Sequence, residues 1–517
     1  MVKSIHEDGP LFSYHYTPPV LSDIGTASIN DDTIFRVGSL SKIFPALAAL
    51  QSKSIHLDES VLEYIPQLKE AAASTSAETI SWEDITVDSL MTHLSGLATD
   101  TAFDLGIFPT PLWQTIGLPA IPQGTGPNCS GLPGTPPCTQ DDLVKDLQKR
   151  EPIYLPYTSP SYSNVGFALL GMIIDAATNK SYIDNIQDNV FDIVNMNSSS
   201  FNGFVESFSE NGFVPVGETT WNVTLGVFES AGGMFSSTSD LIAFAEGILN
   251  NRFLSPRRTR EWMKPRSHTS SGGYSVGAPW EILRSDHLTA DGRIVDLYTK
   301  SGDLGLYHGV FGLVPDFDVS VVLLIAGAEV NENMPSEIFS AIVEELIPAV
   351  DKAGRAEAAS LEVLNGTYTD HSTNSTMVLT IDADNNLAME KFIVQGFDVL
   401  HHPDLYSLDG LSANPESLTK ASYVNARLYP TNLVAQSPNG NTQRSWRAIY
   451  DTATAAENLA EDAKMVWKNG SCQSWLELDR AAYDFKSTGD FIFSYGKGGK
   501  LTEISAAAFN VTLTRAA

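Results

Sequence analysis

The sequence predicts an α/β domain over residues 1–355, with an antiparallel sheet flanked by helices, followed by a mostly antiparallel β domain over 356–517. The chain has 517 residues, more than the roughly 250–300 that one hydrophobic core supports. Apolar helical segments alternate with β-rich segments as far as residue 350, and short alternating segments with turn residues follow from about residue 361. We therefore expect the domain boundary in the polar segment 351–360.

The first part of the α/β domain begins with two expected strands, at residues 12–19 and 33–38, where aromatic and β-branched residues gather. The apolar segment 41–51 then predicts a buried helix, and residues 85–97 predict another. Residues 99–140 are rich in Pro, Gly and Thr and predict a long loop. Loops of that length are usually functional or disordered.

The second part of this domain begins with a strongly apolar helix, expected at residues 164–179. A Gly turn followed by Ser, Thr and Asp capping residues predicts another helix within 231–250. Strands are expected at 293–302 and 319–327, joined through the sequence VPDFD, and an amphipathic helix at 335–350. In the C-terminal domain, alternating segments predict antiparallel strands and turns.

Composition excludes several classes of function. There are 62 acidic and 32 basic residues, so the net charge is −30. This argues against nucleic acid as a partner, because phosphate binding needs a basic surface. No apolar run approaches the ~20 residues that a membrane helix needs. No metal-ligand spacing is present, and we expect no metal and no cofactor.

The cysteines and glycosylation sequons favour a secreted protein. Cys129 and Cys138 share a Pro/Gly-rich loop and predict a disulfide, with two free thiols as the alternative, while Cys472 is left over as an apolar residue. Eight asparagines stand in N-x-S/T sequons: Asn128, Asn179, Asn197, Asn222, Asn365, Asn374, Asn469 and Asn510. We expect an extracellular protein, from which a leader has been removed, and favour a monomer.

The first candidate for chemistry is the pair Ser39 and Lys42. Residues three apart share a helix face, so the amine can approach the serine oxygen. A buried lysine can lose its proton and act as a base. S-x-x-K alone is a weak signal, and a surface pair is the ordinary alternative. Here, apolar residues flank the pair on both sides.

Two further groups complete the candidate site. Tyr162 and Asn164 stand just before a buried helix, where the alternative for the tyrosine is a packing role. Lys300, Ser301 and Gly302 end a strand, where the alternative for the lysine is a solvated edge residue.

Together, the ordered motifs S-x-x-K, Y-x-N and K-S-G resemble those of the serine β-lactamase and penicillin-binding-protein superfamily. The middle motif points to the branch with class C β-lactamases, D-aminopeptidases and family VIII esterases. The segments TVDSLMTHLSGL, SNVGFALLGMII and AGGMFSSTSDLIAF are also similar to family segments. The resemblance covers about residues 12–350 and implies the family's antiparallel sheet with a helical subdomain. The C-terminal domain resembles lipocalin-like barrels attached to some members, which can bind a ligand at the mouth or wall the cleft.

The resemblance implies a role for each motif residue. Ser39 would be the nucleophile, Lys42 would share its proton, and Tyr162 would be the other general base, its phenol pKa lowered by Lys42 and Lys300. Asn164 would orient Lys42 and the substrate. Ser301 and Gly302 would line the strand along the acyl group, and the backbone N–H groups of Ser39 and Asp303 would form the oxyanion hole.

Some features depart from the family pattern. Asp303 adds a negative charge at the rim, which should disfavour the carboxylate that β-lactams carry. His308 offers an alternative third motif of the H-x-G kind, but we prefer Lys300 because its strand fits the family without gaps. Phe103, Phe108 and Trp113, with the disulfide loop, would form an apolar lid, and a surface excursion is the alternative.

We therefore expect a serine hydrolase or acyltransferase that forms an acyl-Ser39 ester from a small ester, amide or thioester. The chain looks like a secreted fungal β-lactamase-related protein, for which a role in secondary metabolism is an option. Esterase activity is placed ahead of D-amino-acid peptidase and β-lactamase activity. A peptidoglycan enzyme would need a pocket for an anionic peptide, which the net charge disfavours. The alternative from another class is an inactive binding or scaffold protein.

Overall fold

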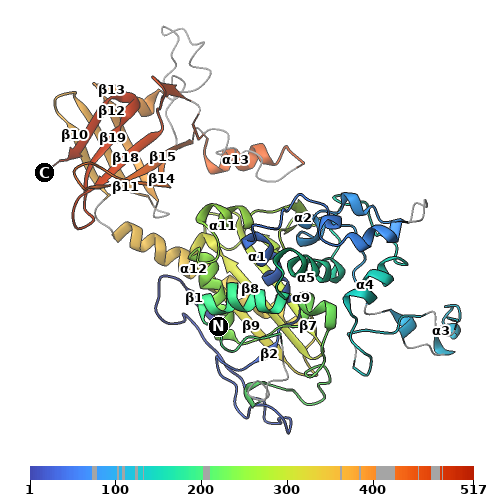
Figure 1. Ribbon diagram of the computed structural model, residues 1–517. Helices are drawn as coiled ribbons and strands as arrows, with labels where there is room; N and C mark the ends of the chain where they lie inside the picture. Colours follow the sequence, from blue (N-terminus) through green and yellow to red (C-terminus); the bar gives the residue numbers. More distant parts are fainter. Residues whose placement is uncertain are drawn as a thin grey trace. The chain divides into compact units, whose positions relative to one another are not determined.

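The computed structural model describes residues 1–72, 79–101, 104–107, 111–122, 126–131, 133–201, 210–360, 364–382, 386–402, 425–451, 453–466, 478–479 and 481–516 (Figure 1). These residues form two compact units, Met1–Pro348 and Ala349–Ala517. Helix α12 (Met334–Ser360) runs across this division, so the segment expected as the boundary is helical.

The first unit is built on a seven-stranded sheet, counted over the described residues, whose neighbouring strands are all antiparallel. In spatial order the strands are β1 (Val2–Ser4), β9 (Val319–Ala326), β8 (Tyr307–Val314), β7 (Val295–Leu304), β6 (Glu281–Ser285), β5 (Tyr274–Val276) and β4 (Ser267–His268). A separate pair, β2 (Phe35–Arg36) and β3 (Phe235–Ser236), leads into the first helical turn. The predicted antiparallel α/β fold is confirmed.

Helices cover both faces of this sheet. The described helices of this unit include α12 and also η1 (Gly38–Lys42, a 3-10 turn), α1 (Ile43–Gln51), α2 (Val87–Met91), α3 (Pro111–Thr115), α4 (Gln140–Leu147), α5 (Asn164–Thr178), α6 (Tyr182–Ile186), α7 (Asp192–Val194), α9 (Glu229–Gly232), α10 (Thr238–Leu249) and α11 (Pro256–Trp262). Phe311 of β8 packs on Phe244 of α10, whereas a Cβ at the next residue, Gly312, would lie 2.6 Å from Phe339 of α12. Since successive strand residues point to opposite faces, α10 and α12 lie on opposite sides.

The helices that lead to the site are buried. All residues of α1 from Ile43 to Leu50 are buried, as are those of α5 from Val165 to Ile174. Burial of each large apolar side chain stabilises the fold by about 1.5–3 kcal/mol. The rings of Phe44 and Phe244 stack at 4.4 Å, which ties α1 to α10. These two apolar helices therefore give the site a rigid support.

Two of the predicted elements at the start of the chain are wrong or too long. The segment 12–19 forms no strand, since only Phe12 makes a bridge, to Val2, and the edge of the sheet is already occupied by β1. The helix predicted at 85–97 ends at Met91, because His93 adopts a left-handed conformation with φ 58°. A left-handed residue ends a helix.

Strand β8 was not predicted, although it lies between two strands that were. Its sequence contains Gly309 and Gly312, and glycine is depleted in strands. The tertiary structure explains the second glycine, because the ring of Phe339 leaves no room for a side chain there. The connection between β7 and β9 is thus a full strand rather than a loop.

The second unit contains an antiparallel barrel, which confirms the predicted β-rich domain. Its strands are β10 (Gly366–Asp370), β11 (Ser375–Ile381), β12 (Leu387–Val394), β13 (Phe397–Asp398), β14 (Asn425–Gln436), β15 (Thr442–Asp451), β18 (Asp490–Tyr495), β19 (Leu501–Ala506) and β20 (Val511–Arg515). Pairing of β11 with β12 closes eight of them into the barrel, and β13 extends from β12. The unit also contains a hairpin, β16 (Ala482–Tyr483) and β17 (Lys486–Ser487), the helix α13 (Ala455–Asp462) and two 3-10 turns, η9 (Val399–His401) and η13 (Ala507–Phe509).

The interior of the barrel is filled by its own side chains. Tyr368, Phe392, Phe491 and Phe493 are fully buried, and the rings of Phe392 and Phe491 lie 5.4 Å apart. A small barrel packed in this way is a hydrophobic core. No helix among the described residues has the length and apolar character needed to cross a membrane.

Candidate active site

Ser39 lies in η1, where the chain turns from β2 into α1. Gly38, just before it, has φ +51°, and a Cβ there would lie 2.7 Å from the carbonyl oxygen of Asp303. A Cβ at Gly302 would overlap the carbonyl oxygen of Val37. Glycine at both positions lets the backbone next to Ser39 lie directly against the end of β7. The segments that carry the expected oxyanion donors, Ser39 and Asp303, are therefore adjacent.

Lys42 lies one turn after Ser39 and is fully buried. Its Nζ donates hydrogen bonds to Ser39 Oγ at 2.9 Å, to Asn164 Oδ1 at 2.6 Å and to the carbonyl oxygen of Ala231 at 2.6 Å. Burial lowers the pKa of Lys42, because desolvation disfavours its charged form. The amine is thus held within hydrogen-bond distance of the Ser39 hydroxyl, with which it can exchange a proton.

Tyr162 approaches Ser39 from the other side. Its hydroxyl donates to Ser39 Oγ at 2.7 Å. Its ring centroid lies 4.9 Å from Lys42 Nζ and 5.1 Å from Lys300 Nζ. Desolvation raises the pKa of the phenol, but Lys300 and Lys42 together outweigh it and bring the pKa below its ordinary value. Ser39 therefore lies between two groups that can accept its proton.

The cap of α5 explains how Tyr162 and Asn164 reach the site. Ser163 is the N-cap, and its Oγ accepts from the N–H of Gly166 at 2.9 Å. Ser163 has an extended backbone, and the residue after it is helical. This local structure fixes the positions of the side chains of both neighbours of Ser163. Tyr162 and Asn164 both contact the Ser39–Lys42 pair as a result.

Lys300 of β7 is held by a residue that sequence reasoning missed. Glu281, the first residue of β6, pairs through Oε1 with Lys300 Nζ, and its Oε2 accepts from the N–H of Ser301 at 2.7 Å. Burial alone would lower the pKa of Lys300, but Glu281 and then Tyr162 raise it above the ordinary value. Lys300 thus stays a cation beside Tyr162.

Asp100 is a second residue that sequence reasoning missed. Its carboxylate accepts from Asn164 Nδ2 at 2.9 Å, which leaves the amide oxygen of Asn164 to face Lys42. Burial raises the pKa of Asp100, although Asn164 and Lys42 act in the opposite direction. The pair Asp100–Asn164 fixes the direction of the lysine's hydrogen bond.

His93 is the third missed residue, although it stands in the segment THLSGL that was matched to the family. Its ring stacks on that of Tyr162, with centroids 4.5 Å apart, and its Nδ1 accepts from the N–H of Ser163 at 3.1 Å. Burial, and then Lys300 and Lys42, lower its pKa far below the ordinary value, so the imidazole is neutral. Its ring therefore packs against the ring of Tyr162.

The remaining predicted site residues lie in several places. His308 of β8 is paired through Nδ1 with Asp303 at 2.6 Å, whereas Lys300 Nζ lies 5.1 Å from the ring centroid of Tyr162. Trp113 lies in α3, which Figure 1 draws apart from α1 and β7, so the structure does not bring it to Ser39. The rest of the expected lid, Phe103 and Phe108, falls outside the described residues.

The structure describes two of the three cysteines and most of the sequon asparagines. Cys129 and Cys138 form a disulfide. Seven sequon asparagines are exposed: Asn128, Asn179, Asn197, Asn222, Asn365, Asn374 and Asn510. Asn469 and Cys472 lie outside the described residues.

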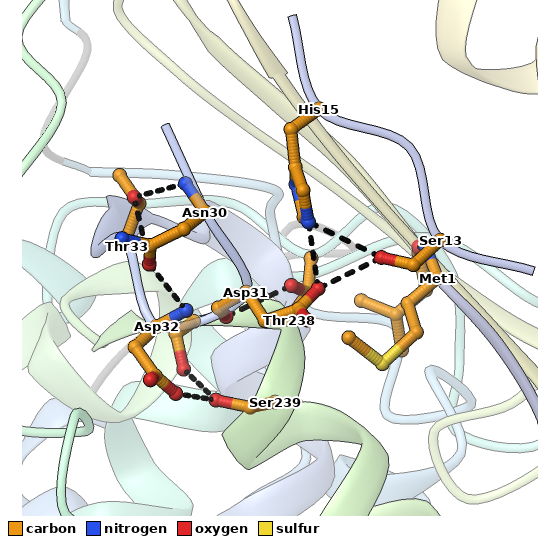
Figure 2. A network of polar contacts seen from close by, with 11 residues as sticks. Met1, Ser13, His15, Asn30, Asp31, Asp32, Thr33, Thr238 and Ser239 are labelled. Atoms are coloured by element: carbon orange, nitrogen blue, oxygen red, sulfur yellow. Dashed lines mark hydrogen bonds and ion pairs between the residues drawn. The ribbon is translucent and has the colours of Figure 1, made fainter. Parts of the chain in front are cut away.

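Away from the Ser39 site, a serine, a histidine and an aspartate lie together on the surface, but they lack the geometry of a catalytic triad. Ser13 Oγ and Asp31 Oδ1 approach the same ring nitrogen of His15, Nε2, at 3.2 and 2.9 Å (Figure 2). In a working triad the acid and the serine bind opposite ring nitrogens. Ser13 therefore gains no base that is oriented by an acid, and it serves as a control for Ser39.

Beneath the site, Glu229 begins α9, the helix whose Ala231 carbonyl accepts from Lys42. One of its oxygens accepts from the N–H of Leu225 at 2.8 Å, and the other is buried with no hydrogen-bond partner among the described residues. Burial raises the pKa of Glu229 to about 7. The folded state therefore holds one proton more than the unfolded state between about pH 4.5 and 7.

Glu229→Gln is expected to stabilise the protein at alkaline pH. Ionisation of the buried carboxyl costs stability as pH rises from about 4.5 to 7, up to about 3 kcal/mol. Urea unfolding at pH 5 and pH 8 should show that the free energy of unfolding of the variant increases relative to that of the wild type as pH rises. Glu83→Gln, which removes an exposed carboxylate, is the control, and an equal gain in that variant would contradict the prediction.

Comparison with known proteins matched two family models to this chain. The family model described as Beta-lactamase matches residues 8–341, and one described as Beta-lactamase-like-like, C-terminal domain, matches 354–517. A "Beta-lactamase-like protein" of Arthroderma benhamiae is 28% identical over 92% of this chain and 79% of its own length. "Probable hydrolase clz13" of Cochliobolus lunatus is 25% identical over 97% and 82%.

A solved class C beta-lactamase aligns with a TM-score of 0.45 and 20% identity, over 62% of this chain and 83% of that one. A D-amino acid amidase from Ochrobactrum anthropi aligns with a TM-score of 0.46 and 19% identity, over 62% and 88%. Likeness at this level has no bearing on activity.

Proposed function

Since this chain belongs to the beta-lactamase family, whose model matches more than half of its length, we propose that it is a serine hydrolase acting through an acyl-Ser39 ester. The observation that carries the proposal is the position of Ser39 Oγ, 2.9 Å from Lys42 Nζ and 2.7 Å from the Tyr162 hydroxyl. A serine needs an adjacent base to become a nucleophile, and here two such groups contact it.

The proposed reaction has two halves. Ser39 Oγ transfers its proton to the Lys42–Tyr162 pair and forms a bond to the acyl carbon, while the carbonyl oxygen takes the negative charge beside the N–H groups of Ser39 and Asp303. The bond to the leaving group then breaks, and Tyr162 returns a proton to that group. Water or an alcohol next attacks the acyl carbon and gives its proton to the same pair. The bond from the acyl carbon to Ser39 Oγ then breaks, and the pair returns a proton to that oxygen.

We propose a small ester, amide or thioester with an apolar acyl part as the substrate. The cations at the site, Lys42 and Lys300, are buried and paired with protein atoms, whereas the Asp303 carboxylate is partly exposed. This arrangement favours an uncharged acyl part over an anionic one. An aminopeptidase is the second candidate, because Asp303, whose side chain is 54% exposed, offers a carboxylate to an ammonium group.

The test is the intact mass of the protein after incubation with a fluorophosphonate, beside the Ser39→Ala and Ser13→Ala variants. We expect one adduct on the wild type and on Ser13→Ala, and none on Ser39→Ala. An adduct that persists in folded Ser39→Ala would contradict the assignment of Ser39 as the nucleophile. No adduct on any folded form would favour the binding or scaffold protein. Turnover of p-nitrophenyl butyrate and of a penicillin then ranks esterase against β-lactamase activity.

A further inference from the structure

The turn between β7 and β8 is held by a glutamate that lies far from it in the sequence. The last pair of the two strands is Leu304 with Tyr307, so Gly305 and Leu306 form a two-residue turn. Gly305 has φ +59°, as turns of this kind require. The N–H of Leu306 donates to Glu218 Oε2 at 2.7 Å. The carboxylate therefore fixes the tip of the hairpin.

Glu218 is in turn fixed by Thr220. Its Oε1 accepts from the backbone N–H of Thr220 and from the hydroxyl of the same residue, the latter at 2.6 Å. A Cβ at Gly305 would overlap that hydroxyl oxygen and lie 2.8 Å from Glu218 Oε1, so the glutamate lies directly against the turn. Hydrogen bonds to a carboxylate are roughly twice as strong as those between neutral groups. Both oxygens of Glu218 are thus committed to the backbone around them.

The segment that carries this glutamate is also bound to the strand that leads to Ser39. Arg36 of β2 is 1% exposed, and its Nη1 donates to the carbonyl oxygens of Thr220 and Val223, each at 2.6 Å. We call residues 218–223 the clamp segment. It is hydrogen-bonded both to β2 and to the β7–β8 turn.

Each of the two elements bound by the clamp segment carries one N–H group that the proposed reaction assigns to the oxyanion. Ser39 follows Arg36 by three residues, and Asp303 precedes Gly305 by two. The two elements lie against each other, since a Cβ at Gly38 would lie 2.7 Å from the carbonyl oxygen of Asp303. An oxyanion needs both donors at about 2.7–3.1 Å from one oxygen. A small shift of the turn relative to Ser39 would therefore separate them, and the clamp segment opposes that shift.

We propose that Glu218 is a positioning residue for the oxyanion hole, which acts by holding the β7–β8 turn in place relative to Ser39. This rests on the proposed acyl-Ser39 chemistry and adds a residue to it. Glutamine cannot replace the glutamate, because its side chain has one acceptor oxygen where two are used. In Glu218→Gln the amide NH2 would face the N–H of either Leu306 or Thr220, and that hydrogen bond would be lost.

The experiment compares the rates at which Ser39 is labelled by diisopropyl fluorophosphate and by its analogue with P=S in place of P=O. In each reaction Ser39 Oγ forms a bond to phosphorus, its proton passes to the Lys42–Tyr162 pair, and the P–F bond breaks to release fluoride. The P=O oxygen takes the place of the oxyanion, whereas sulfur is a weaker hydrogen-bond acceptor. A shifted donor therefore slows the oxygen reagent more than the sulfur reagent, whereas general damage to the protein slows both.

We expect Glu218→Gln to lower the second-order rate constant about tenfold for the P=O reagent and less than about threefold for the P=S reagent. Glu59→Gln is the matched control, because Glu59 is also a half-buried glutamate, and it accepts from the Tyr64 hydroxyl at 2.7 Å. The ratio of the P=O rate to the P=S rate should stay at the wild-type value in this control. Intact mass measured over time gives both rates, with Ser39→Ala as the blank.

A ratio that falls in Glu218→Gln and not in Glu59→Gln supports the proposal. An unchanged ratio, or an equal fall in the control, overturns it, while a Ser39 adduct on the wild type still upholds the hydrolase. No adduct on the folded wild type overturns both. If Glu218→Gln does not fold, Thr220→Ala decides, because it removes the hydroxyl that holds Glu218 Oε1. Its ratio should fall about threefold, and an unchanged ratio overturns the proposal.

Discussion

Lys42→Met is expected to lower kcat/KM for p-nitrophenyl butyrate by about 10³- to 10⁴-fold, or about 4 to 5.5 kcal/mol of transition-state stabilisation. Methionine is apolar and of similar length, so it suits a fully buried position. It removes the amine that lies 2.9 Å from Ser39 Oγ. Steady-state kinetics, together with the rate of fluorophosphonate labelling, measure the effect.

The control for this variant is Lys3→Met. Lys3 is also a buried lysine of the first unit, 7% exposed, but it lies on β1, three strands from β7, and contacts Glu7 and Glu246. We expect its activity to stay within about threefold of the wild type, below 1 kcal/mol. Lys42→Met also leaves the oxygens of Asn164 and Ala231 without their donor, which costs stability of about 1–3 kcal/mol each. A folded Lys42→Met protein with wild-type rates would contradict the assigned role.

Tyr162→Phe is expected to lower kcat/KM by about 10²- to 10³-fold for p-nitrophenyl butyrate, and by a larger factor for ethyl butyrate. The phenol lies 2.7 Å from Ser39 Oγ and its pKa is lowered by Lys300 and Lys42 against the effect of burial. An ethoxide leaving group needs a proton, whereas p-nitrophenolate leaves without one. The dependence on the leaving group therefore reports proton transfer by Tyr162 rather than packing.

Tyr157→Phe is the matched control for that measurement. Tyr157 lies on the same loop, and its hydroxyl contacts Thr86 at 2.5 Å rather than the site. Removal of this hydroxyl should lower kcat/KM for both esters equally and only slightly. An equal loss for the two esters in Tyr162→Phe would mean that the tyrosine only supports the structure.

Local patterns account for the parts of the fold and site that were predicted correctly. The apolar segments 41–51 and 164–179 became buried helices because their composition leaves no polar face. The predictions failed where a residue distant in the sequence determines the structure. In β8, Phe339 requires a glycine at position 312, and at the sheet edge β1 occupies the place expected for the segment 12–19.

By itself, the sequence determined what depends on neighbours along the chain. Lys42 lies one turn after Ser39, and the Ser163 cap places Tyr162 and Asn164 at one helix start. Only the tertiary structure decided which distant groups contact these residues. Glu281 meets Lys300 across 19 residues, and Asp100 meets Asn164 across 64. These contacts depend on the register of the strands and on the path of the loops. Both are set when the apolar helices become buried, so the spacing of residues along the chain does not encode them.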